Sequence, residues 1–294
     1  MPCRINRLMN TVTQRLLVFF IGIPVVITLV RLPYYHHLAM HLLALCAAFF
    51  AANELHTMLK KNYAVHPKPL VLLLVSAVPV MGILCTLLGW DLCYIDFTFV
   101  AAVLVVLSFE TLTAQTFAQS NARIATSVFV ILYCGYFFSF VSKMTLFPSA
   151  TAYIAFFLLF VFMCDSLAWF FGVLFGRNNK GLFKASPNKS VAGFAGGIAG
   201  AVAVGLIGHY LLPKYCGIVI FGGTPWKAVV LGVLMGCSAI VGDLTESVLK
   251  RSADVKDSGK LIPGRGGMLD CVDSIVFSAP IYYWLVSILY NPVV

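Results

Sequence analysis

The stretch from Gly242 to Asp273 holds an unusual share of the ionisable side chains of this 294-residue chain. Six of the eleven acidic residues fall there, and five basic residues share the stretch. The acidic residues are Asp243, Glu246, Asp254, Asp257, Asp270 and Asp273, and the basic residues are Lys250, Arg251, Lys256, Lys260 and Arg265. Carboxylates can bind a hard cation such as Mg²⁺, and Lys and Arg can bind phosphate oxygens. The composition of this stretch therefore predicts a polar site.

The segment PGRGG at 263–267 lies inside the same stretch. Glycine-rich backbone turns tightly and lets a ligand approach closely, and exposed N–H groups in such a turn can hold phosphate oxygens. Asp270 and Asp273 follow one helical turn apart, at the start of an apolar segment. Mg²⁺ binds through one or two carboxylates together with substrate phosphates. The pattern predicts a nucleotide or pyrophosphate site, and the alternative is a solvated loop.

The spacing of Asp243, Glu246 and Lys250 is that of one helix face. If the helix predicted to end near Gly242 continues, all three side chains share that face. The alternative is a solvated helix in which Glu246 and Lys250 form an ordinary i,i+4 ion pair.

A second stretch, Cys164–Gly197, places Asp165 inside an apolar segment, and an ionisable residue there is a functional candidate. The alternative for Asp165 is a buried hydrogen bond to a neighbouring helix. Four basic residues follow, and they predict either contact with an anionic lipid headgroup or ordinary cytoplasmic loop charge. They are Arg177, Lys180, Lys184 and Lys189. Four glycines at small-residue spacing then predict close helix packing: Gly193, Gly196, Gly197 and Gly200. Glu54 lies near the end of another apolar segment and is predicted to be interfacial.

The composition of the whole chain indicates that it lies in a lipid membrane. Hydrophobic residues make up 61% and charged residues 11%, whereas soluble domains carry about 25% charged residues. Mean hydropathy is +0.95. The chain is therefore predicted to be an all-α polytopic membrane protein. Its net charge of +9 fits cytoplasmic loops and lipid headgroups better than nucleic acid.

Nine apolar segments are long enough to be transmembrane helices. They are 16–30, 38–59, 69–90, 94–109, 124–142, 150–175, 191–212, 227–242 and 274–290. The first is read as a retained helix rather than a signal peptide, because no small-x-small cleavage site follows it. With the N-terminus in the cytoplasm, sixteen Lys and Arg fall on the cytoplasmic side and four outside. We expect one membrane unit, with structural helices in 1–145 and the catalytic cytoplasmic loops in 146–294. The nine cysteines show no C-x-x-C spacing and predict no disulfide framework.

The 247–273 stretch resembles the signature of the phosphatidate cytidylyltransferases, also called CDP-diacylglycerol synthases. That signature reads S-x-x-K-R-x(4)-K-D, then a proline–glycine turn with H-G-G, then D-R-x-D. The matching residues are Ser247, Lys250, Arg251, Lys256, Asp257, Pro263, Gly264, Gly266, Gly267, Asp270 and Asp273. The preceding GDLTES also looks like the family, as does the earlier segment with Asp165, Ser186, Pro187 and Lys189. The resemblance covers about the C-terminal half of the chain.

The resemblance implies that CTP and phosphatidate react to give CDP-diacylglycerol and pyrophosphate. It also implies a multi-helix fold in a bacterial-type inner membrane, a site that faces the cytoplasm, and Mg²⁺, alone or with a second cation. Asp243, Asp270 and Asp273 are the expected metal ligands. Lys250, Arg251 and Lys256 are expected on the CTP phosphates, with Asp257 in the catalytic set. The expected substrate-binding residues are Asp165, Ser186, Lys189, Ser247, Gly264, Arg265, Gly266 and Gly267. The expected partners are CTP, phosphatidate and membrane lipids, with no nucleic acid, and a homodimer is left open.

Departures from the signature keep other functions open. The histidine of H-G-G is Arg265, the arginine of D-R-x-D is Cys271, and a glutamate of the earlier segment is Ala192. A lysine of that segment is Asn188. Arginine cannot shuttle a proton near neutral pH as histidine can. The alternatives are a related CTP-dependent transferase acting on another lipid phosphate and a catalytically weak family member. A transporter is disfavoured, because no internal repeat is evident and the charges lie in predicted loops.

Overall fold

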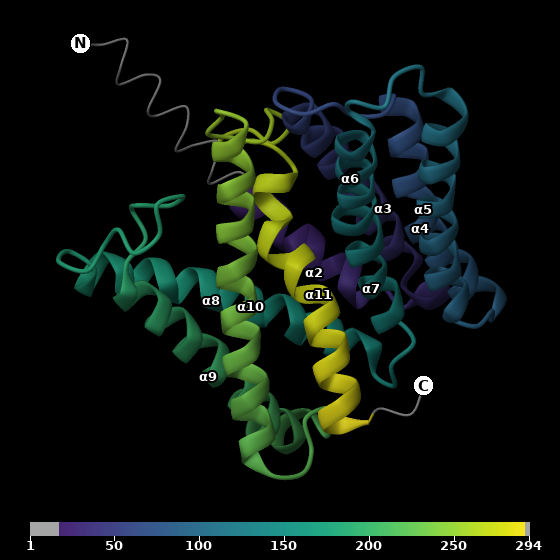
Figure 1. Cartoon of the computed structure of the whole chain (residues 1–294). Coiled ribbons are helices and arrows are strands. Elements are labelled where there is room, and N and C mark those ends of the chain that lie inside the picture. The colour runs from purple at the N-terminus through teal and green to yellow at the C-terminus, as the bar shows by residue number, and fades with distance from the viewer. Residues whose placement is uncertain (1–17, 292–294) are drawn as a thin grey trace. The chain divides into compact units, whose positions relative to one another are not determined.

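The computed structural model describes residues 18–291, and every named element in that range is a helix. In chain order these are η1 (Val18–Gly22), α2 (Ile23–Arg31), α3 (Tyr34–Leu59), α4 (Lys68–Leu88), α5 (Cys93–Thr113), α6 (Ser120–Val130), η2 (Ile131–Tyr136), α7 (Phe137–Met144), α8 (Ala150–Phe175), α9 (Val191–Cys216), α10 (Pro225–Ser252) and α11 (Leu269–Tyr290). Figure 1 shows their course. The elements η1 and η2 are short π-helical turns.

Eight helical segments within the described residues are long and apolar enough to cross a membrane. This confirms the predicted class of all-α polytopic membrane protein. The eight correspond to the last eight predicted segments, with α6, η2 and α7 forming one continuous segment, Ser120–Met144. The first predicted segment, 16–30, begins outside the described residues, and its described part is helical from Val18 to Arg31.

The predicted 243–273 loop is shorter than expected. α10 continues through Asp243 to Ser252, and α11 begins at Leu269. The helical continuation required to place Asp243, Glu246 and Lys250 on one face is therefore present. Only residues 253–268 connect the two helices.

The described residues up to Tyr136, together with Ser252–Val272, form the first of two compact units. The expected division at residue 145 separates structural helices from catalytic loops rather than compact units, and it stays a prediction. Within this unit η2 packs closely on α4, because a Cβ at Gly135 would lie 3.0 Å from the carbonyl oxygen of Val75.

A buried charged cluster fixes one end of the first unit. Glu110 of α5 binds the guanidinium of Arg123 through both carboxylate oxygens, with the shorter Nε bond at 2.9 Å. The Nε2 atom of His66 lies 2.9 Å from the Oε2 atom of Glu110, and its Nδ1 atom lies 2.8 Å from the Oγ atom of Ser127. The cluster therefore ties the connection before α4 to α5 and α6.

Phe137–Arg251, with the described residues from Asp273 onward, form the second unit. Its helices α8 and α9 lie side by side (Figure 1). A Cβ at Gly197 would lie 3.0 Å from the carbonyl oxygen of Cys164, and one at Gly196 would lie 2.6 Å from the Phe171 side chain. The predicted use of the glycine series in close helix packing is therefore confirmed.

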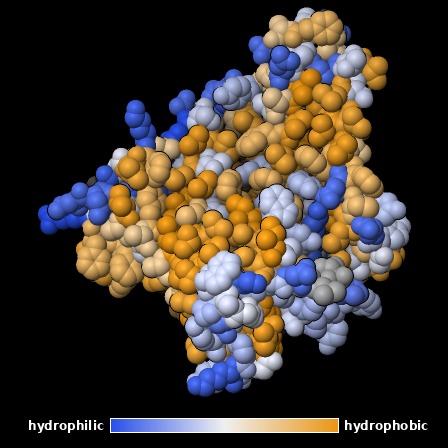
Figure 2. Space-filling model, turned by 60° about the horizontal axis from the view of Figure 1, so that its bottom comes forward, coloured by the Kyte–Doolittle hydropathy of each residue, from blue (hydrophilic) through white to orange (hydrophobic). Residues whose placement is uncertain are grey.

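Large apolar side chains are exposed along several of these helices, and broad apolar areas cover the face seen in Figure 2. An exposed apolar surface of this extent is expected where lipid is the solvent. Together with the eight apolar segments, it identifies an integral membrane protein.

Candidate active site

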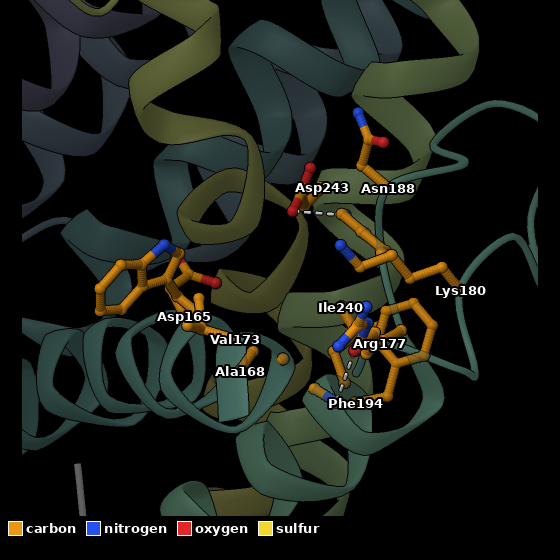
Figure 3. Close-up of a pocket in the computed structure, with 14 residues that line it drawn as sticks. Asp165, Ala168, Val173, Arg177, Lys180, Asn188, Phe194, Ile240 and Asp243 are labelled. Carbon is orange, nitrogen blue, oxygen red and sulfur yellow. Dashed lines mark hydrogen bonds and ion pairs between the residues drawn. The ribbon is translucent and has the colours of Figure 1, made fainter. Parts of the chain in front are cut away.

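A cavity of about 680 Å³ lies in the second unit, between α8, the 176–190 connection, the start of α9, and α10. Figure 3 shows the side chains around it. The lining residues are Asp165, Ala168, Trp169, Gly172, Val173, Arg177, Lys180, Asn188, Lys189, Ser190, Gly193, Phe194, Ile240 and Asp243. Its volume is in the range of small-molecule sites.

Opposite charges share this cavity. Asp165 comes from α8 and Asp243 from α10, as Figure 3 shows. Lys189 forms an ion pair with Asp243, marked by the dashed line from Asp243. Arg177 and Lys180 are exposed and line the same cavity. Carboxylates that can bind a cation and cations that can bind phosphate are therefore present together.

The 176–190 connection folds back on itself, which places its basic residues at the cavity. The backbone N–H of Gly181 donates to the carbonyl of Lys189 at 3.3 Å, and that of Val191 donates to the carbonyl of Asn179 at 3.0 Å. Lys180 and Ser190 consequently lie opposite each other. The Oγ atom of Ser190 then caps α9 by accepting from the N–H of Gly193 at 3.1 Å.

One wall of the cavity is apolar. Trp169 and Val173 of α8 line it with exposed fractions of 71% and 63%. In a membrane helix, such side chains face lipid. A cavity with charged and apolar walls suits an amphiphile that carries an anionic headgroup.

Close packing of α10 on α11 brings a second carboxylate-bearing turn near Asp243. A Cβ at Gly242 would lie 3.0 Å from the carbonyl oxygen of Asp273 and 2.9 Å from the Cβ of Phe277. The Oγ atom of Ser274 donates to the carbonyl of Ala239 at 3.1 Å. The glycine that precedes Asp243 therefore lets the turns of Asp243 and Asp273 approach.

Further along α10, Lys250 and Glu246 form the i,i+4 ion pair of the alternative interpretation, but the pair is buried rather than solvated. The Lys250 side chain is 15% exposed and that of Glu246 is 1% exposed. A phosphate bound by Lys250 would have to compete with this buried carboxylate.

The first unit holds the glycine turn and Asp270. The Oδ2 atom of Asp270 accepts hydrogen bonds from the N–H of Ser258 at 2.8 Å, the Oγ–H of Ser258 at 2.8 Å and the N–H of Gly267 at 2.7 Å. The N–H groups of Arg265 and Gly266 donate to the carbonyl of Ile262. The N–H groups of Arg265, Gly266 and Gly267 thus donate within the loop in this structure, and the predicted phosphate contact of the turn stays a prediction.

Glu54 of α3 also binds this loop. Its Oε1 atom accepts from the N–H of Met268 at 2.9 Å, and its Oε2 atom accepts from the N–H of Leu269 and the hydroxyl of Ser258, both at 2.9 Å. Glu54 is only 7% exposed, so it is buried against this loop, and its predicted position at the membrane interface stays a prediction. The signal that could have found it is a carboxylate inside an apolar helix.

Between residues 18 and 291, no group of three or more Asp, Glu, His or Cys side chains forms a metal-binding cluster. Asp270 belongs to the first unit, and Asp243 and Asp273 belong to the second. The triad of metal ligands therefore stays a prediction from the motif. Because Mg²⁺ needs only one or two protein carboxylates beside substrate phosphates, the oxygen donors of Asp243 and Asp273 fit it chemically.

Comparison with known proteins identifies the family of this chain. The model of the cytidylyltransferase family matches residues 13–289. The chain belongs to this family. Proteins named phosphatidate cytidylyltransferase are among its relatives: that of Synechocystis is 42% identical over 132 residues, and that of Bacillus subtilis is 35% identical over 191 residues. A third, from Chlamydia trachomatis, is 39% identical over 127 residues.

These matches cover only part of each protein. They span 44%, 64% and 43% of this chain for the Synechocystis, Bacillus and Chlamydia relatives, in that order. They span 41%, 66% and 40% of the relatives' own lengths. The chain thus covers less than two thirds of the length of each of these relatives.

In this member of the cytidylyltransferase family the predicted site residues fall into separate groups. Asp165, Lys189 and Asp243 meet at the cavity, whereas Ser186 lies in the same connection but is not among the lining residues. Ser247, Lys250 and Arg251 lie on the last turns of α10. The first-unit loop carries Lys256, Asp257, Gly264, Arg265, Gly266 and Gly267. The exposed Arg265 lies on this loop, Cys271 lies in the first turn of α11, and Ala192 lies in the first turn of α9.

Proposed function

We propose that this chain transfers CMP from CTP to phosphatidate, which gives CDP-diacylglycerol and pyrophosphate. The observation that carries the proposal is the cavity of the second unit, where Asp243 and Lys189 lie together with the exposed apolar Trp169. A phosphate headgroup with acyl chains needs basic groups and an apolar wall in the same place. Membership of the cytidylyltransferase family supports the reaction type.

In the proposed reaction, an oxygen of the phosphatidate phosphate attacks the α-phosphorus of CTP. The new P–O bond forms as the bond from that phosphorus to the oxygen bridging the α- and β-phosphorus breaks, and pyrophosphate leaves. Such a transfer needs little covalent help from the protein, so positioning and charge neutralisation dominate. Arg177, Lys180 and Lys189 would bind phosphate oxygens at the cavity. Lys250, Arg251 and Lys256 are proposed on the CTP phosphates from the motif.

We also propose Mg²⁺, alone or with a second cation, as the cofactor. Asp243 and Asp273 would hold it, and Asp270 remains a proposed ligand on the motif alone. When bound, the ion would neutralise phosphate charge. Lys189 pairs with Asp243 and so keeps that carboxylate directed at the cavity. The excess of Lys and Arg in alternate connections supports a cytoplasmic N-terminus and a site on the cytoplasmic side of the membrane.

The test is pyrophosphate release from CTP by the purified chain in detergent, with and without phosphatidate and Mg²⁺. We expect turnover only when both are present, and formation of CDP-diacylglycerol in equal amount. Asp243→Asn is the matched variant, and we expect it to release far less pyrophosphate. No product under conditions in which an authentic phosphatidate cytidylyltransferase is active would reject the proposal.

A related CTP-dependent transfer to another lipid monophosphate is the second candidate. Arg265, Cys271 and Ala192 favour it, because each departs from the resembled signature. The same assay with other lipid monophosphates in place of phosphatidate separates the two candidates. If none supports turnover, restoring His, Arg and Glu at these three positions tests whether the chain is a disabled family member.

A further inference from the structure

We propose that Glu54 is a positioning residue, which holds the connection between α10 and α11 so that Asp270 and its neighbours keep one arrangement. The inference rests on the proposed function, because that loop carries the motif residues Lys256, Asp257 and Gly266. Glu54 itself lies outside the motif, on α3. It acts through the loop rather than on a substrate.

The first argument is the cap that Glu54 provides to α11. Leu269 is the first residue of that helix, and its N–H donates to Glu54, as does the N–H of Met268 before it. The first N–H groups of a helix have no partner inside the helix, and a carboxylate at this end also interacts favourably with the helix dipole. Glu54 therefore caps α11 from α3, a role that a side chain next to the helix start usually fills.

The second argument is the link between Glu54 and Asp270. The Oγ atom of Ser258 lies 2.9 Å from the Oε2 atom of Glu54 and 2.8 Å from the Oδ2 atom of Asp270. A serine hydroxyl has only one hydrogen to donate. The two carboxylates thus share one donor, so a change at Glu54 reaches Asp270 through a single intervening side chain.

The third argument is the close fit of the loop backbone around the carboxylate. A Cβ at Gly259 would collide with the Oε1 atom of Glu54, and a Cβ at Gly267 would collide with its Oε2 atom. The two glycines therefore permit the backbone to enclose this carboxylate. Lys61, just beyond α3, also donates to the carbonyl of Ala253 at 3.3 Å, and Asn62 donates to that of Ser252. The C-terminal part of α3 and the residues just after it thus hold the 253–268 connection at both its beginning and its end.

Glu54→Gln removes this anchor with little change in size. The amide oxygen of glutamine can accept one of the two backbone N–H groups, but its NH₂ group then faces the other donor. Partners that orient a metal-binding carboxylate typically change metal affinity or activity by about 10–100-fold when they are lost. We expect a loss of turnover in that range, with the rest of the first unit unaffected.

The experiment measures hydrogen–deuterium exchange by mass spectrometry on the full chain in detergent, together with CTP- and phosphatidate-dependent pyrophosphate release. For Glu54→Gln we expect at least about tenfold faster exchange in peptides covering residues 262–270. Exchange in α4 and α5 should match the wild type. Thr57→Val is the matched control, since Thr57 lies one turn along α3 and its exposed hydroxyl bonds only the carbonyl of Asn53 and the Lys68 ammonium. It should leave both exchange and turnover unchanged.

Three results would overturn the proposal: unchanged exchange in 262–270, faster exchange throughout α3–α6, or faster local exchange with full turnover. The second of these would mean that Glu54 only stabilises the unit. If Glu54→Gln does not fold, Ser258→Ala is judged by the same criteria. If the wild-type chain fails to turn over CTP and phosphatidate, the proposed function fails, while the exchange comparison still decides whether Glu54 holds the loop.

Discussion

Replacing Gly232 by alanine tests whether the contact of α9 with α10 sets the geometry of the cavity. A Cβ at Gly232 would lie 2.5 Å from the Cα atom of Val202 and 2.8 Å from its backbone nitrogen. Carbon atoms in favourable contact lie about 3.5–4.0 Å apart. The two helices must therefore separate by about 1 Å. No side-chain rotation can relieve the collision, because the atoms that are met belong to the backbone.

The expected cost has a stability part and a functional part. Inserting a methyl group into a packed contact typically costs about 1–3 kcal/mol of folding free energy. Asp243 lies about three turns further along α10, and Lys189 immediately precedes the cap of α9. A shift of about 1 Å between these elements would disturb the Lys189–Asp243 pair and can lower a reaction rate by about 100-fold.

The assay pairs the thermal midpoint in detergent with pyrophosphate release under saturating substrates. Gly222→Ala is the control, since the nearest heavy atom to a Cβ there is the Val219 Cγ1 atom at 3.2 Å, the end of a side chain. We expect Gly232→Ala to lower both the midpoint and the turnover, and Gly222→Ala to change neither by much. A Gly232→Ala protein with wild-type midpoint and wild-type turnover would refute the reasoning.

Three other substitutions probe separate parts of the molecule. Glu110→Ala should lower the free energy of unfolding, because Arg123 and His66 lose their carboxylate partner; chemical denaturation in detergent measures this, and Arg123→Met in the same chain should recover part of the loss. Asp243→Asn should lower turnover at least about 100-fold with the thermal midpoint nearly unchanged, and near-normal turnover would remove Asp243 from the reaction. Arg177→Ala should raise the KM for phosphatidate by about tenfold at constant kcat, as loss of a phosphate contact does; an unchanged KM would place the headgroup elsewhere.

Features that depend on local sequence could be predicted. Helix positions followed from hydrophobic runs, and the glycine series before Gly200 indicated close packing because small residues let helix backbones meet. The Glu246–Lys250 pair followed from helical spacing alone. The boundaries of α10 and α11 were harder to predict, because both helices continue into polar sequence where hydropathy carries no signal.

Features that depend on tertiary contacts could not be predicted. Lys189 and Asp243 meet only because α9 packs on α10, and nothing in either segment indicates the partner. Glu54 reaches the N–H group of Leu269, which lies 215 positions later in the chain. A carboxylate in an apolar helix signals that some partner exists, but the identity of that partner follows only from the fold.

The two lysine–carboxylate pairs that involve α10 differ in how accessible they are to a ligand. Buried donors and acceptors usually have partners, and both the Asp270 carboxylate and the Glu246–Lys250 pair bond within the protein. Glu246 and Lys250 have side chains only 1% and 15% exposed, so a ligand would have to break a buried pair. Asp243 and Lys189 have side chains 37% and 24% exposed at the edge of a cavity. A bound cation can take the place of Lys189 beside Asp243, and a phosphate can take the place of Asp243 beside Lys189. Because both side chains are partly exposed, this replacement costs least here, and binding of a charged substrate is expected to begin at this pair.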